Sequence, residues 1–156
     1  EIIDQFGWRP PRNIIVPVGN GTLFAAMHKA CEELKLVGLI SRVPKIIGVE
    51  ASGCDPIVKA WQRGDHEVIE QKKAKTIASA ILCGDPVDAP KALHWLARHK
   101  GEMVSVTDNQ IMAARAELGR QGFYVEMSGA VAYAAWRKLK PSGSTAIVLS
   151  GHGLKG

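Results

Sequence analysis

The fold follows from one stretch near the amino terminus, Ile14-Ile15-Val16-Pro17-Val18-Gly19-Asn20-Gly21-Thr22. A continuous apolar run such as residues 14–18 is typical of a strand covered on both faces, because a half-exposed strand would alternate apolar and polar residues. After the glycines, apolar residues recur at three- and four-residue intervals from Leu23 to Val37, and Gly38 is a plausible stop. The stretch therefore predicts a buried strand that leads through a tight turn into a helix.

Three further apolar runs predict strands of the same kind, over residues 45–51, 102–106 and 145–149. Segments with helical spacing separate them. This alternation predicts an α/β fold with three layers: a mainly parallel sheet of about four strands, with helices on both faces. In such a sheet, ligands bind beyond the carboxyl ends of the strands.

Local signals place the remaining helices. We predict a helix that opens at Asp88 and Pro90 and reaches Gly101. Thr107 and Gln110 match a capping box for a helix over residues 108–121, and an alanine-rich helix begins at Ser128. The stretch from Gly64 to Lys75 carries the weakest pattern and is predicted to be a mobile loop.

Composition bounds the class of protein. The chain has 156 residues, 46% apolar and 22% charged, which fits one globular domain, residues 1–156. The net charge of +5 is dispersed, and no aromatic RNA-binding motif accompanies it, so nucleic acid is not expected as a partner. No run approaches the roughly 18 apolar residues of a membrane span, and no export signal is present. We therefore expect a soluble, cytoplasmic protein.

Cysteine usage points to reduced thiols. Cys31, Cys54 and Cys83 are odd in number and widely spaced, and they form no CxxC pair, which argues against disulfides and against zinc. No metal site is expected. The chain also begins at Glu1 without an initiator methionine, so we expect it to be a piece of a longer protein.

The turn at residues 19–22 is a candidate phosphate site. Glycines allow close backbone approach, the helix start offers free N–H groups, and Asn20 and Thr22 are expected to add side-chain hydrogen bonds. A dinucleotide-binding turn is disfavoured because Phe24 stands where a small residue is needed and Glu50 lies farther on than the usual ribose-binding acid. A Walker loop is excluded because no Gly-Lys-Ser or Gly-Lys-Thr follows. Taken alone, the motif also fits a turn that binds nothing.

A second candidate is the carboxyl-terminal segment around Ser150, which follows the last predicted strand. Its hydroxyl, beside two glycines, suits contact with a flat ligand, although an ordinary turn fits the spacing equally well. Leu149 stands where a serine hydrolase needs glycine, so that class is disfavoured. His152 by itself indicates no base.

These segments occur together, in one order, in a known enzyme family. The matching stretches are Val16-Pro17-Val18-Gly19-Asn20-Gly21-Thr22, Ile47-Gly48-Val49-Glu50-Ala51, Gly53-Cys54-Asp55-Pro56-Ile57, Thr76-Ile77-Ala78, Gly122-Phe123-Tyr124-Val125-Glu126, Ser128-Gly129-Ala130 and Ser150-Gly151-His152-Gly153-Leu154-Lys155. They resemble threonine synthase and its relatives among the fold type II pyridoxal-phosphate enzymes. The Gly-Asn-Gly loop combined with the Gly-His-Gly-Leu-Lys ending is the most specific part.

The resemblance implies a cofactor site and a reaction. Pyridoxal 5'-phosphate would be bound through its phosphate by Gly19, Asn20, Gly21 and Thr22, and Ser150 would face its pyridine nitrogen. In this family O-phosphohomoserine loses phosphate and gains water to give threonine. The substrate would be a small phosphorylated amino acid, and the full-length protein would be a homodimer.

The resemblance also implies that part of the enzyme is absent. The family's Schiff-base lysine lies in an amino-terminal segment that has no counterpart here, and Lys29, Lys35, Lys59 and Lys91 sit on predicted helices as ordinary solvated amines. The chain would be the carboxyl-terminal part of the large domain, inactive alone, and we assign no catalytic residue in it.

Two departures from the family pattern leave the activity open. Ser79 stands where many relatives carry an acidic residue, and Met127 stands where proline often occurs. A related dehydratase, or a β-replacement enzyme such as a cysteate synthase-like one, is the alternative. A hypothesis of another class is a non-catalytic α/β module that binds phosphorylated metabolites or a partner protein.

Overall fold

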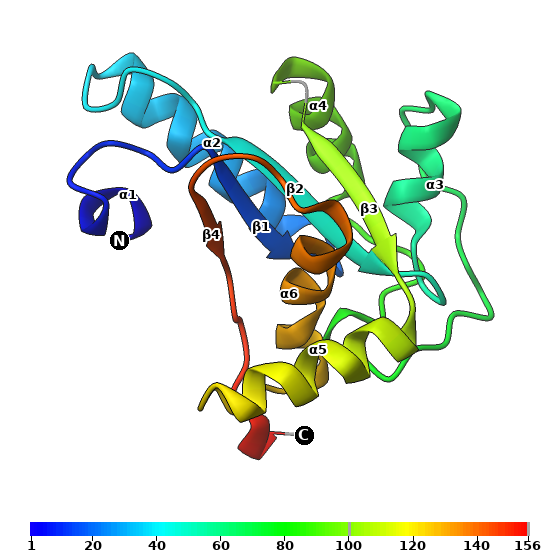
Figure 1. Cartoon of the computed structure of the whole chain (residues 1–156). Helices are drawn as coiled ribbons and strands as arrows, with labels where there is room; N and C mark the ends of the chain where they lie inside the picture. Colours follow the sequence, from blue (N-terminus) through cyan, green and yellow to red (C-terminus); the bar gives the residue numbers. More distant parts are fainter. Residues whose placement is uncertain (100, 156) are drawn as a thin grey trace.

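Four parallel strands form a single sheet in the order β3-β2-β1-β4. The computed structural model describes residues 1–99 and 101–155 (Figure 1). The strands are β1 (Asn13–Pro17), β2 (Lys45–Ala51), β3 (Glu102–Val106) and β4 (Thr145–Ile147). All three pairings are parallel, which confirms the predicted sheet. The last strand ends at Ile147 and not at the predicted residue 149. Val148 N–H still donates to Ile15 O, but the next ladder position on β1 is Pro17, which has no N–H to donate.

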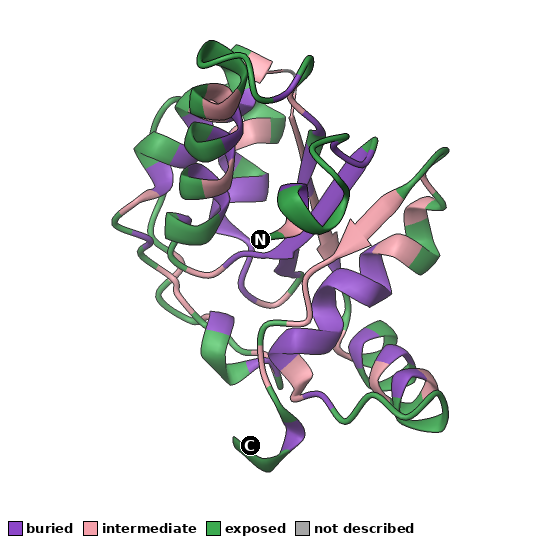
Figure 2. Cartoon of the chain, turned by 90° about the vertical axis from the view of Figure 1, so that its left-hand side faces the viewer, coloured by how far each residue is buried: buried purple, intermediate pink, exposed green. Residues whose placement is uncertain are grey.

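The helices lie on both faces of the sheet, as predicted. They are α1 (Ile2–Gln5), α2 (Thr22–Leu36), α3 (Pro56–Arg63), α4 (Ala89–His99), α5 (Asp108–Arg120) and α6 (Met127–Leu139), with short 3₁₀ turns η1 (Ser79–Ile81) and η2 (Gly153–Lys155). Adjacent residues of β1 point to opposite faces. Ile14 packs on the side of α2, α3 and α4, whereas Ile15 packs on the side of α5 and α6. Figure 2 shows the resulting buried centre and exposed outer helix faces.

The helix start and stop signals predicted from the sequence are found in the structure. In the capping box of α5, Gln110 N–H donates to Thr107 Oγ1 at 3.3 Å, and Thr107 N–H donates to Gln110 Oε1 at 2.8 Å. Gly38 follows the end of α2 with a φ of +77°, a conformation that suits glycine. The helix predicted from Ser128 begins one residue earlier, at Met127.

The stretch from Gly64 to Lys75 contains no helix or strand, as its pattern indicated. It is nevertheless fastened at Gln71, whose side chain donates to Gly53 O at 2.9 Å and accepts from Asp55 N–H at 3.3 Å. Its mobility stays a prediction. None of the described helices has the length and apolar character needed to cross a membrane.

Candidate functional site

The turn between β1 and α2 presents free backbone donors. Gly21 is the N-cap of α2, has a φ of +91°, and supplies no side-chain cap to the helix. The first N–H groups of a helix have no partner within it. The positive end of the helix dipole lies at the same place, so the turn favours an anion.

The start of a second helix, α6, lies near this turn, and η1 packs between the two. An added Cβ on Gly19 would lie 2.9 Å from the Cα of Ile81 in η1, so only glycine allows the two backbones to approach this closely. η1 is held in turn by α6, because Ala80 N–H donates to the buried Ser128 Oγ at 3.1 Å. α6 also begins without a side-chain cap. Two uncapped helix starts therefore border one space.

Ser150 reaches this space from the other end of the chain. A cavity of about 310 Å³ is lined by Pro17, Val18, Gly19, Asn20, Gly21, Thr22, Leu23, Phe24, Ala80, Ile81, Glu126, Ser128 and Ser150. All five residues predicted for the cofactor thus line the same cavity. Its volume lies at the lower end of the range for small-molecule sites. Within residues 1–99 and 101–155, no protein group is hydrogen-bonded to the Ser150 hydroxyl, which leaves it available to a ligand.

Glu126 is a cavity-lining residue that the sequence did not assign. Its backbone N–H donates to Gly151 O at 3.1 Å, and its carboxylate occupies the space that a Cβ on Gly151 would need. The Glu126 motif was part of the family resemblance, but nothing in its spacing showed that it would meet Ser150. That meeting depends on how α6 packs beside the carboxyl-terminal segment.

The side chains of Asn20 and Thr22 have protein partners. Thr22 Oγ1 lies 2.5 Å from Asp88 Oδ2, and Asn20 Oδ1 accepts from Val87 N–H at 2.8 Å. Asn20 Nδ2 donates to Thr22 Oγ1 at 3.2 Å. Contact of these two side chains with a phosphate stays a prediction.

Among the described residues, no lysine lines the cavity. Lys29, Lys35, Lys59 and Lys91 all lie on helices, as predicted, and are exposed. Lys59 Nζ pairs with Asp55 at 2.7 Å, and Lys91 Nζ pairs with Asp88 at 2.7 Å. These are ordinary ion pairs of solvated amines.

The Glu50 side chain stabilises the start of α3. It is 1% exposed and accepts from the N–H groups of Val58 at 2.8 Å and Ile57 at 3.4 Å in the first turn of α3. Burial raises the pKa of Glu50 to about 8, against the opposing effect of those two amides. Both side-chain oxygens of Glu50 are thus hydrogen-bonded within the fold, which gives the dinucleotide hypothesis no support.

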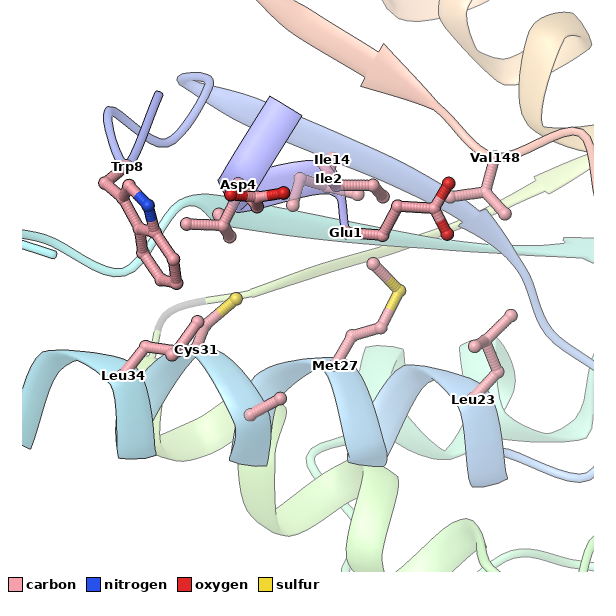
Figure 3. A pocket seen from close by; sticks show the side chains of 12 residues that line it. Glu1, Ile2, Asp4, Trp8, Ile14, Leu23, Met27, Cys31, Leu34 and Val148 are labelled. Atoms are coloured by element: carbon pink, nitrogen blue, oxygen red, sulfur yellow. The ribbon is translucent and has the colours of Figure 1, made fainter. Parts of the chain in front are cut away.

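A separate apolar cavity of about 410 Å³ lies between the amino-terminal segment and α2. Figure 3 shows Leu23, Met27 and Leu34 on α2 pointing toward Ile2 and Trp8 across it. It contains none of the predicted site residues and few polar groups. We assign the functional site to the cavity at Gly19–Thr22.

Gly21 offers a direct test of the loop. Gly21→Ala is expected to destabilise the loop by about 1–2 kcal/mol, because its φ of +91° is unfavourable for alanine and the new Cβ would lie 3.2 Å from the Asp88 carbonyl. Binding of pyridoxal phosphate should weaken in proportion, as measured by fluorescence titration. Gly119→Ala is the matched control, since Gly119 lies in α5 with open space around it; that change should stabilise the protein. Equal effects of the two changes would contradict this reading.

The chain matches known proteins along nearly its whole length. Residues 1–151 match the family model described as "Pyridoxal-phosphate dependent enzyme". The chain is 38% identical to threonine synthase of Methanocaldococcus jannaschii and 37% identical to that of Methanosarcina acetivorans, in each case over 99% of this chain and 40% of the relative. It therefore spans about 40% of the length of these curated relatives.

Solved structures share the fold at lower identity. Threonine synthase from Escherichia coli matches with a TM-score of 0.71 and 21% identity, over 92% of this chain and 33% of that one. An L-serine ammonia-lyase from Rhizomucor miehei matches with a TM-score of 0.80 and 20% identity, over 96% and 48%. These likenesses confirm the three-layer α/β architecture.

Proposed function

The chain belongs to the family of pyridoxal-phosphate-dependent enzymes, and from this premise we propose that it forms the cofactor-binding part of a threonine synthase-like lyase. One observation carries the proposal: Gly19–Thr22 and Ser150, from opposite ends of the chain, line a single cavity. The family depends on pyridoxal phosphate, and the two uncapped helix starts fit the phosphate of that cofactor.

The proposed roles follow from the donors present. Gly19, Asn20, Gly21 and Thr22 would bind the phosphate of the cofactor, and Ser150, which lines the same cavity, would meet its pyridine nitrogen. When bound, pyridoxal phosphate supplies an electron sink for carbanion chemistry. Ser150 carries a neutral hydroxyl, which leaves the pyridine nitrogen largely unprotonated and so moderates that sink. This suits elimination and replacement reactions.

The proposed substrate is O-phosphohomoserine. The bond from its γ carbon to the phosphate oxygen breaks and the β carbon loses a proton, which leaves with the phosphate. Water then adds a hydroxyl to the β carbon and a proton to the γ carbon, and the products are threonine and phosphate. The similarity to threonine synthases over 99% of the chain supports this choice. We further propose that the enzyme works as a homodimer in the cytoplasm, where its free cysteines would remain reduced.

The second candidate is a related dehydratase or β-replacement enzyme. Ser79 and Met127, which depart from the threonine synthase pattern, lie on η1 and at the start of α6. Both elements border the cavity. The same cofactor site would then serve the loss of water from a hydroxyamino acid.

We propose that residues 1–156 act with a further segment that supplies the cofactor-binding lysine. Two findings support this: no lysine lines the cavity within residues 1–99 and 101–155, and the chain covers about 40% of its curated relatives. The 156-residue chain alone should then show no turnover.

The test starts with the intact mass of the natural gene product, which should exceed 16.8 kDa. The purified product should release phosphate from O-phosphohomoserine and form threonine, whereas the 156-residue chain should not. Formation of 2-oxo acids from serine or threonine, without phosphate release from O-phosphohomoserine, would support the dehydratase instead. A gene product of 16.8 kDa that turns over neither substrate would contradict both.

A further inference from the structure

The Thr22 hydroxyl has one proton, which it donates in a hydrogen bond to the Asp88 carboxylate. Thr22 Oγ1 lies 2.5 Å from Asp88 Oδ2, and an ionised carboxylate can only accept. Hydrogen bonds from Lys91 and Thr22 lower the pKa of Asp88, which keeps this carboxyl ionised at neutral pH. In this arrangement the Thr22 hydroxyl donates to Asp88 and has no proton left for a phosphate.

Asn20 completes the same attachment. Its Nδ2 donates to Thr22 Oγ1 at 3.2 Å, and its Oδ1 accepts from Val87 N–H at 2.8 Å. The loop backbone also lies close to the same segment. A Cβ added to Gly21 would lie 3.2 Å from the carbonyl oxygen of Asp88. Both polar side chains of the loop thus fasten it to the segment before α4.

The charge at Asp88 makes this arrangement testable. A carboxylate near a bound phosphate repels it, so its removal alone should strengthen phosphate binding. Lys91 Nζ, 2.7 Å from Asp88 Oδ1, offsets part of that repulsion but is itself exposed. A weaker phosphate site after removal of Asp88 would therefore show that the carboxylate acts by positioning.

We propose that Asp88 is a positioning residue for the phosphate loop: it holds the Thr22 hydroxyl, so that the loop presents its backbone N–H groups, and not the Thr22 hydroxyl, to the cofactor phosphate. This inference rests on the proposed function of the same loop. It assigns a role to a residue outside the predicted site.

The experiment compares pyridoxal phosphate with pyridoxal, which lacks the phosphate. The ratio of their affinities isolates the phosphate contribution, and a variant that is only less stable should not change it. In the natural gene product, Asp88→Ala and Thr22→Val should each lower the ratio roughly tenfold, the scale of one charge-assisted hydrogen bond. The double variant should be no worse than either single one, since both remove the same contact.

Matched variants complete the test. Thr22→Ser and Asp88→Asn keep the donor and the acceptor, so both should stay within about threefold of wild type. Asp85→Ala removes an exposed carboxylate from the same segment, one that makes no hydrogen bond or ion pair with the described residues of the loop, and should leave the ratio unchanged. If Thr22→Val lowers the ratio while Asp88→Ala raises it, the Thr22 hydroxyl binds the phosphate directly and the inference is overturned. A wild-type protein that binds both compounds equally would instead overturn the proposed function.

Discussion

Phe24→Ala is expected to lower the free energy of unfolding by about 3–5 kcal/mol, the usual cost of emptying a buried aromatic site. Phe24 is 0% exposed and sits in the first turn of α2, two residues after the phosphate loop ends. Its ring packs over the bare backbone of Gly48, where an added Cβ would lie 2.9 Å from it, and meets His28 edge-on at 4.7 Å. No larger residue at position 48 would leave room for this ring.

Urea unfolding followed by circular dichroism gives the measurement. Leu36→Ala is the control, because Leu36 lies at the end of the same helix and is 79% exposed. That change should cost less than about 1 kcal/mol. Similar losses for the two variants would show that Phe24 does not anchor α2. Because domains are only marginally stable, the predicted loss should also reduce the amount of folded protein at 37 °C.

Acidification is expected to destabilise the protein through His28. His28 belongs to α2, is 0% exposed, and packs its ring against α4. Neither ring nitrogen has a hydrogen-bond partner among the described residues. Burial and, to a smaller extent, the charge of His99 lower the pKa of His28 from 6.5 to about 4, against the opposing effect of Glu32. Trp95 stacks on the His28 ring at 6.2 Å. The nearby carboxylate of Glu32 is paired with Arg98 at 2.6 Å, so it stabilises a protonated His28 only weakly.

The direction in which pH changes the free energy of unfolding follows from proton uptake. Between pH 6.5 and 4 the unfolded chain binds a proton at His28 that the folded chain does not, so stability falls as the pH falls. The full effect is about 3 kcal/mol, from a pKa shift of this size. Glu50 acts oppositely: with its pKa raised to about 8, it favours the folded state increasingly as pH falls from 8 to 4.5.

The variant His28→Leu separates the two effects, because leucine fills similar space and takes no proton. The unfolding free energy of wild type, less that of His28→Leu, should fall by about 3 kcal/mol between pH 7 and pH 4. His66→Ala, a change in an exposed loop, is the control for replacing a histidine elsewhere in the chain. A difference between wild type and His28→Leu that stays constant with pH would refute the assignment to His28.

Much of the fold could be predicted from the sequence because its two central strands, β1 and β2, are buried on both faces. The runs at residues 14–18 and 45–51 are continuous and apolar for that reason, and helix signals such as Thr107 with Gln110 act locally. The last strand was predicted too long, since its end depends on pairing with β1. The short α1, η1 and η2 carry too few residues to show a period.

The candidate site was only partly predictable. Gly19 and Gly21 stand out because a turn before a helix has a recognisable chemistry, and Ser150 followed from the family resemblance. The direction of a side chain is set by its tertiary neighbours, so nothing in the sequence showed that Thr22 would bond to Asp88, 66 residues farther along the chain. For the same reason Glu126 was not assigned.

The central claim is that pyridoxal phosphate binds between the phosphate loop and Ser150. Hydrogen exchange of the natural gene product, with and without pyridoxal phosphate, tests it most directly. We predict slower exchange for the amides of residues 19–24 and for the first turn of α6, with exchange around the apolar cavity beneath α1 unchanged. Unaltered exchange at residues 19–24, with protection elsewhere in the chain, would contradict it.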